Sequence, residues 1–152
     1  MSRAKIYLRR GKEESLLRRH PWVFSGAIER IECDGESIPE GALVDIFTQR
    51  GEYIARGHYQ IGSIAVRILT FEQEAIDAKW WHKRVATAFD VRRTLDLTEN
   101  EQTNCYRLIH GEGDLLPGLV VDIYGTIAVV QCHSVGMYLS RNEIAAAIRE
   151  VY

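Results

Sequence analysis

A histidine and two carboxylates lie within five residues of one another, in the segment His110-Gly-Glu112-Gly-Asp114. A histidine beside a carboxylate could serve as a general acid or base. The intervening glycines could instead form a backbone nest for a phosphate. A glycine-built turn, whose acidic side chains bond their own backbone, is the third interpretation. The sequence favours the turn, and a small enzyme using His110, Glu112 and Asp114 is the weaker alternative.

A second segment places cations directly beside aromatic residues. Arg18, Arg19 and His20 end a predicted short helix, because the ring of Pro21 cannot continue one. Trp22, Val23 and Phe24 follow as a predicted buried anchor, and Ser25-Gly26 forms a turn. Cationic side chains held in place by a rigid core are suited to binding a polyanion. The alternative is that the arginines only complement the helix dipole.

The charge distribution supports a localised binding face. Residues 1–20 carry seven lysines and arginines against Glu13 and Glu14, a net charge of +5, although the whole chain has a net charge of −2. That overall charge argues against a general nucleic-acid coat protein, which would be basic. A cationic end on a weakly acidic body is compatible with one polyanion-binding face.

The cysteines and histidines predict neither a disulfide framework nor a metal site. Cys33, Cys105 and Cys132 are widely spaced without a C-x-x-C pair, and the five histidines lack ligand spacing. Cys105 and Cys132 fall in predicted strands, so we expect both to be buried and structural. Glu32 and Asp34 flank Cys33 and should raise its thiol pKa, which makes it a poor nucleophile.

The composition is that of an ordinary soluble globular protein, with 46% hydrophobic and 26% charged residues. No apolar run approaches the ~20 residues of a membrane helix, and the N-terminus does not resemble a signal peptide. The sequence therefore predicts a cytoplasmic protein that does not contact a membrane. No glycine-rich nucleotide motif or nucleophile elbow is present. Trp80-Trp81 could stack bases, but a place in the core is favoured.

The first half of the chain predicts a small β-barrel or sandwich. The expected strands are residues 5–9, 22–24, 27–31, 42–48, 53–59 and 64–70, with one helix over 12–19. Turn signals about every ten residues are typical of such folds. Gly41, Gly51, Gly57 and Gly62 suit the tight corners.

The pattern changes near residues 72–76, where we place a domain boundary. Asp77 is a plausible N-cap for a helix to about residue 95, in which Trp81, Val85, Ala88, Phe89 and Arg92 share one face. Strands are expected over 105–110, 119–124 and 126–132. A final helix from about residue 139 should begin with a Ser140-x-x-Glu143 capping box and carry an apolar stripe of Ile144, Ile148 and Val151.

The predicted fold class is therefore α+β, mostly β: a small barrel over residues 1–74, then a linker helix and a small α/β domain over residues 75–152. The sequence stops in mid-helix without a C-cap glycine, which indicates a fragment.

Two runs of sequence resemble one family. Residues 16–27, LLRRHPWVFSGA, resemble the N-terminus of bacterial S-adenosylmethionine-dependent cytosine-5 methyltransferases of large-subunit (23S) ribosomal RNA. Residues 106–125 are similar to a signature of the same family, roughly R-L-x-x-G-E-x-D-x-L-P-G-L-x-x-D. The two matches occur in the family's order, and the resemblance covers essentially the whole chain.

The resemblance implies a parent of three parts: an RNA-binding PUA domain, a small α/β domain, and a Rossmann-like methyltransferase domain with the cofactor and a nucleophilic cysteine. The third part would be absent here, so the resemblance implies no catalytic residue and no cofactor in this chain, with S-adenosylmethionine expected for the parent. Neither Cys105 nor Cys132 inherits the nucleophile's role. The implied RNA contacts are Arg9, Arg10, Lys12, Arg18, Arg19 and His20. The implied structural positions are Pro21, Trp22, Phe24, Gly26, Glu112, Asp114, Pro117, Gly118 and Asp122.

The alternative function is a module without enzymatic role, either a stand-alone PUA RNA-binding module or an interaction module that binds protein rather than RNA. The stripe of Ile144, Ile148 and Val151 motivates the latter, because an exposed apolar stripe in a truncated second domain would favour dimerisation. The expected partners are accordingly large-subunit rRNA, the missing methyltransferase domain, and a second copy of the chain.

Overall fold

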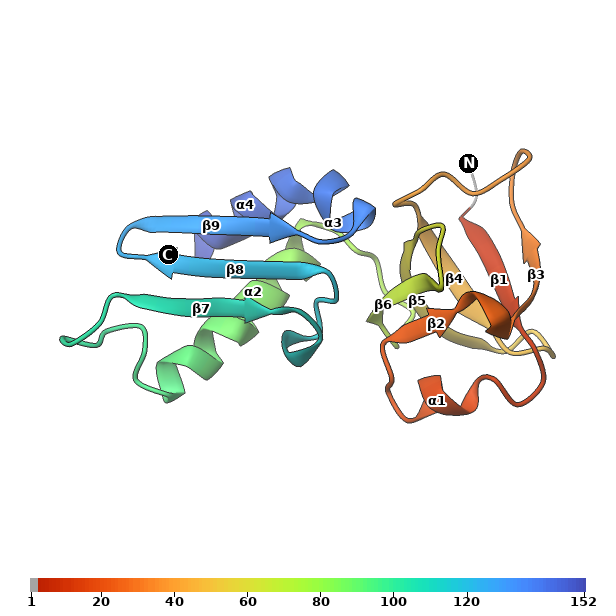
Figure 1. The fold of residues 1–152 in the computed structure, drawn as a ribbon, viewed down its shortest axis with the longest axis horizontal. Helices are drawn as coiled ribbons and strands as arrows, with labels where there is room; N and C mark the ends of the chain where they lie inside the picture. The colour runs from red at the N-terminus through yellow and green to blue at the C-terminus, as the bar shows by residue number, and fades with distance from the viewer. Residues whose placement is uncertain (1–2) are drawn as a thin grey trace. The chain divides into compact units, whose positions relative to one another are not determined.

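Six strands in the first half of the chain form one curled sheet (Figure 1) in the computed structural model, which describes residues 3–152. The strands are β1 (Ala4–Leu8), β2 (Trp22–Phe24), β3 (Ile28–Glu32), β4 (Leu43–Phe47), β5 (Tyr53–Tyr59) and β6 (Ile64–Thr70). Their order is β2-β6-β5-β4-β1-β3. The two edge strands, β2 and β3, are joined only by the short helix η1 (Ser25–Ala27), which spans about 10 Å at most. The sheet must therefore curl strongly, as a half-barrel does.

The apolar face of this sheet forms the core of the first unit, which ends at Glu74. Ile6, Leu8, Val44 and Ile46 come from neighbouring strands β1 and β4 and are all fully buried. Gly57 in β5 is required for close strand packing, since a Cβ there would lie 2.2 Å from the carbonyl oxygen of Arg67. The predicted mixed, mostly β fold with a barrel-like first part is confirmed.

The predicted helix over residues 12–19 is shorter in the structure. Helix α1 spans only Glu14–Leu17, and Arg19 adopts a left-handed conformation with φ of 68°. Arg18 is therefore the C-cap of α1 and Arg19 lies beyond the helix, so neither arginine lies within its last turn. The chain instead turns back there, with the His20 N–H donating to the Ser15 carbonyl. Leu16 is buried and anchors α1 on the sheet.

The second unit, Ala75–Tyr152, combines an antiparallel sheet with helices. Its strands β7 (Cys105–His110), β8 (Leu119–Tyr124) and β9 (Ile127–Cys132) lie in the order β7-β8-β9. Figure 1 shows helices α2 (Ala78–Thr94) and α4 (Arg141–Val151) on one face of this sheet. The predicted N-cap is confirmed, because the Asp77 carboxylate accepts a hydrogen bond from the Trp80 N–H at 3.0 Å.

The C-terminal helices differ from the prediction in two respects. Ser140 does not form a capping box, because its hydroxyl donates to the Gly136 carbonyl at 2.9 Å and an unpredicted helix, α3 (Val135–Leu139), precedes it. The side-chain cap in this region is Ser134, the N-cap of α3, whose hydroxyl accepts a hydrogen bond from the backbone N–H of Met137. The stripe on α4 is not exposed as expected, since Ile144 and Ile148 are buried and α4 packs against α2.

Candidate nucleic-acid interface

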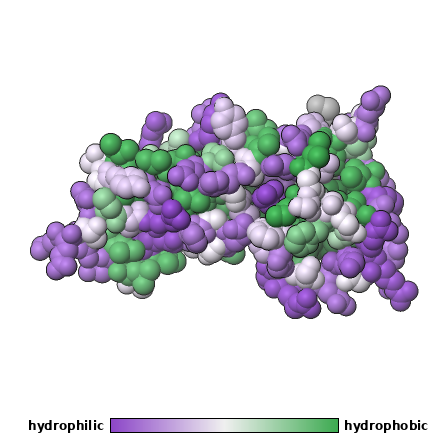
Figure 2. All heavy atoms as spheres, in the orientation of Figure 1, coloured by the Kyte–Doolittle hydropathy of each residue, from purple (hydrophilic) through white to green (hydrophobic). Residues whose placement is uncertain are grey.

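A groove of about 460 Å³ lies beside helix α1 in the first unit, and we name it the aromatic groove. Cationic side chains, Lys12 and Arg18, lie on its α1 side, and the aromatic rings of Trp22 and Phe24 come from β2. The side chains of Lys12 and Arg18 make no hydrogen bond or ion pair with any residue between 3 and 152. In the view of Figure 2 the surface around α1 is mostly hydrophilic.

Three rings form a contiguous cluster at this groove. The His20 ring meets Trp22 edge-on with centroids 5.5 Å apart, and the Trp22 and Phe24 rings are also perpendicular, at 6.2 Å. The backbone N–H of Trp22 donates a hydrogen bond to Nδ1 of His20 at 3.3 Å, which orients the imidazole. The predicted buried anchor is wrong for Phe24, which is 48% exposed, because the β2 residues alternate and only Val23 points into the core.

The other predicted RNA contacts lie in different surroundings. Nε of Arg9 donates to the Gly26 carbonyl at 3.2 Å, so Arg9 supports the turn that borders the aromatic groove. The Arg19 guanidinium lies 4.8 Å from the ring centroid of Phe71. Arg10 lines a separate groove together with Arg50. The structure thus brings Lys12 and Arg18 to the aromatic groove, places the His20 ring against Trp22 beside it, and leaves Arg10 and Arg19 elsewhere.

Pro21 and Gly26 hold this region in place through the backbone. The Pro21 carbonyl accepts from the Ile68 N–H at 2.7 Å, which extends the pairing of β2 with β6. The Gly26 carbonyl receives the Arg9 side chain. Both residues therefore position neighbours and offer no reactive side chain.

The segment His110–Asp114 does not form an acid–base site. Asp114 is committed to Arg92, with two N–H···O contacts of 2.5 and 2.9 Å, and it also accepts from the His110 N–H at 2.6 Å. Glu112 is exposed, and Gly111–Asp114 form a short helix, η2. The interpretation as a structural turn is the one that the geometry supports.

A second ion pair lies on the open face of the same sheet. Asp122 accepts from Nε and a terminal nitrogen of Arg107 at 2.8 and 3.2 Å. These hydrogen bonds lower the pKa of the Asp122 carboxyl below its ordinary value and raise that of Arg107. A second terminal nitrogen of Arg107 lies 3.2 Å from Nδ1 of His110. Asp122 therefore braces strands β7 and β8.

Pro117 and Gly118 form a turn in which only glycine fits. Gly118 has φ of +90°, and a Cβ there would lie 2.6 Å from the Ser134 hydroxyl oxygen. The Gly118 carbonyl accepts from the His133 N–H at 2.7 Å. Since Ser134 caps α3, this turn links the β7–β8 connection to the start of that helix.

The two cysteines and two tryptophans of the second unit differ in exposure. Cys105 is exposed rather than buried as predicted, because it begins β7 on the open face opposite Tyr124. Cys132 is half-buried, and that burial raises its thiol pKa. Trp80 and Trp81 are both buried, which excludes them as a platform for bases.

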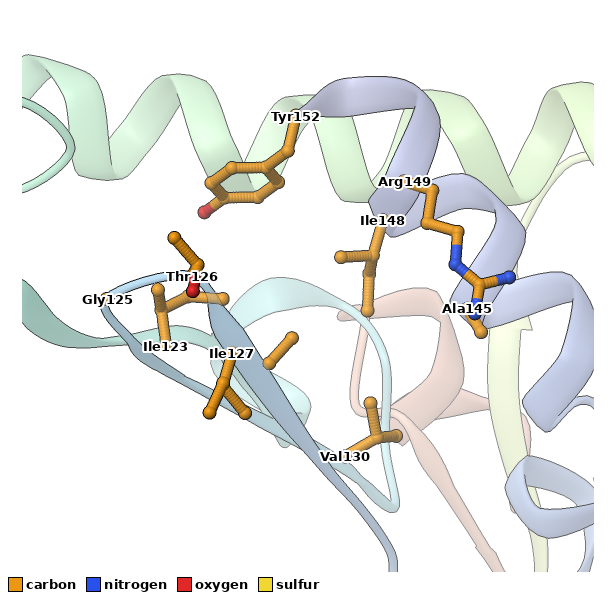
Figure 3. Close-up of a pocket in the computed structure, with 10 residues that line it drawn as sticks. Ile123, Gly125, Thr126, Ile127, Val130, Ala145, Ile148, Arg149 and Tyr152 are labelled. Carbon is orange, nitrogen blue, oxygen red and sulfur yellow. The ribbon is translucent and has the colours of Figure 1, made fainter.

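An apolar groove of about 520 Å³ lies between β9 and α4 of the second unit (Figure 3). Ile123, Val130 and Ile148 contribute apolar side chains to it, and Figure 3 shows Arg149 beside them on α4. Ile127 and Val129 on the edge strand β9 are 63% and 40% exposed. The groove offers an apolar surface and no catalytic pair.

Neither a cluster of metal ligands nor a Rossmann-type cofactor turn is found among the described residues of the second unit. No group of three or more potential metal ligands occurs between residues 3 and 152. The second unit's sheet is wholly antiparallel, so it lacks the parallel strand–glycine turn–helix arrangement that binds adenosyl cofactors. In this part of the chain, no helix is long and apolar enough to cross a membrane.

These observations define a class of protein fold: a PUA-like half-barrel followed by a small α/β unit. Residues 6–71 match the family model described as a PUA-like domain.

The chain as a whole is similar to methyltransferases. It is 39% identical over 150 residues to ribosomal RNA large subunit methyltransferase I of Klebsiella pneumoniae, and equally identical to that of Yersinia pseudotuberculosis. Each match covers 97% of this chain but only 36% and 37% of the relative, so the chain spans little more than a third of the relatives' length.

Two solved structures share the fold. A candidate SAM-dependent methyltransferase from Streptococcus mutans superposes with a TM-score of 0.81 at 19% identity, covering 97% of this chain and 38% of the other. A second candidate methyltransferase, in complex with SAH, gives a TM-score of 0.82 at 19% identity and covers 97% and 37%. The folds of both units are therefore found within larger proteins.

Proposed function

We propose that this chain is the RNA-recognition portion of an S-adenosylmethionine-dependent methyltransferase that modifies large-subunit ribosomal RNA. The observation that carries the proposal is the aromatic groove, where unpaired Lys12 and Arg18 lie beside partly exposed Trp22 and Phe24 in a PUA-like domain. The rRNA methyltransferases to which the chain is 39% identical support the choice of substrate.

Each group in the aromatic groove has a role in RNA binding. Lys12 and Arg18 contact phosphates, which supply most of the affinity and make it dependent on salt. The rings of His20, Trp22 and Phe24 present edges and faces on which an unstacked base can lie. Arg9, Pro21 and Gly26 hold the groove in shape.

The methyl transfer itself belongs to residues outside this chain. The full protein transfers a methyl group from S-adenosylmethionine to C5 of a cytosine in the cytoplasm, and residues 1–74 position the rRNA for it. Residues 75–152 connect this domain to the catalytic part. By itself, the chain binds structured RNA weakly and transfers no methyl group.

Filter binding of a large-subunit rRNA helix–loop at two salt concentrations tests the proposal. We expect Lys12→Glu/Arg18→Glu to weaken binding by more than tenfold at low salt, with a smaller loss at high salt. The matched control is Lys79→Glu/Lys83→Glu, which makes the same charge change on exposed positions of α2. Equal binding by the test variant and the wild type would exclude the aromatic groove as the RNA site.

A protein-interaction module is the second candidate, favoured by the apolar groove between β9 and α4. Its partner is a second copy of the chain or the catalytic part of the full protein. Sedimentation of the purified chain separates the two functions: association that Ile127→Asp abolishes supports the interaction module, whereas a monodisperse monomer that binds RNA contradicts self-association.

A further inference from the structure

Arg67 of strand β6 is half-buried but has no partner for its charge. Its side chain forms no hydrogen bond, ion pair or ring contact with any residue between 3 and 152. The other arginines of limited exposure in this range are all held, since Arg56 and Arg92 pair with aspartates and Arg84 lies over the Trp80 ring. Arg67 therefore differs from the structural arginines, and its charge is available to a ligand.

The strand register places Arg67 beside the ring of Trp22. The two residues lie directly opposite each other in the antiparallel pairing of β2 with β6. The Trp22 N–H donates to His20 and not to β6. One position along, the Ile68 N–H donates to the Pro21 carbonyl. Trp22 and Arg67 are therefore a non-hydrogen-bonded pair, in which the Cα atoms are about 4.5 Å apart and the side chains share one face of the sheet.

Neither residue opposite Arg67 in the sheet carries a negative charge. On the other side of β6, His58 of β5 lies directly opposite Arg67. Burial lowers the pKa of His58 to about 4, so this imidazole is neutral at pH 7. A positive charge that is partly shielded from water and lacks an opposite charge is costly, so an anion that binds Arg67 removes a cost already present in the free protein.

The ring of Trp22 thus has cations on two sides. Lys12 and Arg18 line the aromatic groove toward α1, whereas Arg67 does not line this groove and comes from β6, which borders β2 (Figure 1). Each base of an RNA strand has a phosphate before it and a phosphate after it. A base that stacks on the rings can therefore bring one phosphate toward each set of cations.

We propose that Arg67 binds a backbone phosphate of the RNA, on the side of Trp22 opposite Lys12 and Arg18. Its guanidinium donates two parallel N–H···O hydrogen bonds to oxygens of that phosphate. The RNA strand then crosses the rings, with phosphates held on both sides. This inference rests on the proposed RNA-recognition function and adds a phosphate contact outside the aromatic groove.

Arg67→Met tests the contact, because methionine keeps an apolar stem beside Trp22 and removes the cation. We expect the affinity for a large-subunit rRNA helix–loop to fall about tenfold at low salt, the effect of losing one hydrogen bond to a charged group. The slope of log K against log salt should fall by about 0.7–0.9. Arg67→Lys should retain this slope but lose part of the affinity, because an ammonium group cannot make the bidentate contact.

Urea unfolding separates a binding role from a structural one. Arg67→Met leaves no partner unpaired, so it should unfold at the same urea concentration as the wild type or at a higher one. Arg50→Met is the matched control, because Arg50 is an exposed arginine of the same unit without an ion pair among residues 3–152. It should preserve both affinity and stability. A lower midpoint for Arg67→Met than for Arg50→Met would assign Arg67 a structural role and overturn the proposal.

Inorganic polyphosphate, a chain of phosphates without bases, separates this inference from the proposed function. Equal RNA binding by Arg67→Met and the wild type, with loss of binding in Lys12→Glu/Arg18→Glu, overturns the Arg67 contact and leaves RNA recognition standing. Binding of polyphosphate that Arg67→Met weakens, without binding of RNA, supports the phosphate contact and overturns RNA recognition. Absence of binding to both overturns both.

Discussion

Charged side chains are used differently in the two units. In the second unit, Arg92 and Arg107 are each bound by an aspartate, Asp114 and Asp122. In the first unit, Lys12 and Arg18 face the aromatic groove without an ion-pair partner among the described residues. Paired charges hold strands and helices together, whereas unpaired charges remain available to a ligand. Whether a cation has an ion-pair partner therefore separates structural cations from candidate binding cations more directly than its position in the sequence does.

The first unit also contains paired cations, and the most buried of its ion pairs is Arg56–Asp45. Arg56 and Asp45 are buried neighbours on β5 and β4, joined by hydrogen bonds of 2.7 and 3.2 Å. Arg56 also donates to the carbonyl of Glu74, the last residue of the unit. This pair resembles Arg92–Asp114 in burial and geometry, so the first unit contains both paired structural cations and, at Lys12 and Arg18, cations without an ion-pair partner among the described residues.

The largest expected effect comes from breaking the buried pair of the second unit. Arg92→Met leaves Asp114, only 8% exposed at its side chain, without its cation. We expect a loss of about 3–5 kcal/mol in the free energy of unfolding, because removing one partner strands a buried charge. Urea unfolding followed by the fluorescence of the buried Trp80 and Trp81 measures it.

Arg93→Met is the control for this experiment. Its pair with Asp90 is mostly exposed, with side-chain exposures of 67% and 61%, so its loss should cost less than about 1 kcal/mol. RNA binding by Arg92→Met at temperatures where it remains folded should match the wild type. A parallel loss of RNA affinity would contradict the division between structural and binding cations.

The next effect concerns a buried histidine of the first unit. Burial lowers the pKa of His58 to about 4, and its Nδ1 has no partner among the described residues. Below pH 6.5 the unfolded chain binds a proton that the folded chain does not, so stability falls as the pH decreases from 6.5 toward 4. At pH 5 the loss is about 2 kcal/mol relative to pH 7, from about 1.4 kcal/mol per pKa unit.

His58→Leu removes this dependence, since the buried position no longer titrates. Unfolding midpoints at pH 7 and pH 5 should then differ less than in the wild type. Exposed His133 provides the control, because His133→Leu should leave the pH dependence unchanged. An equal decline in His58→Leu and the wild type would place the acid sensitivity on other groups.

The elements could be predicted from local patterns, but the pairing of charges could not. The strands, the Asp77 cap and the buried face of α2 follow from alternation, capping chemistry and helical period. The approach of Arg92 to Asp114, 22 residues away, depends on how α2 packs on the hairpin, which no local pattern encodes. The short α1 and the exposed Phe24 likewise depend on the curl of the sheet.

The capping-box error has the same physical origin. Ser140 matches the local motif, but the preceding residues continue as α3, so its hydroxyl bonds back to Gly136. The N-cap at Ser134 could have been predicted, because a serine followed by an apolar run is a typical helix start. The contact between Ser134 and the turn at Gly118 could not, because it depends on the fold. Arg50 lacked any sequence signal, because only the fold brings it to Arg10.

Single alanine substitutions give a smaller effect that separates cations within the basic segment. Lys12→Ala and Arg18→Ala should each reduce the slope of log K against log salt by about 0.7–0.9, the share of one phosphate contact. Arg19→Ala should change the slope less, because this guanidinium lies against the Phe71 ring. Salt titrations of RNA binding measure all three, and equal slopes for Arg18→Ala and Arg19→Ala would remove the distinction.

The smallest effect is expected at the exposed pair of the second unit. Asp122→Asn removes the carboxylate that Arg107 holds on the open sheet face, where solvent screens the interaction. Arg107 lowers the pKa of Asp122, so the contribution of this pair to stability is present above pH 3.8 and is lost only as the pH falls below it. Acid unfolding of the wild type and Asp122→Asn should therefore diverge at neutral pH and converge below pH 3.8, a window beneath that of His58. Convergence already between pH 6.5 and 4 would mean that the Asp122–Arg107 pair does not cause the difference at neutral pH, and the assignment of separate pH windows to the two units would fail.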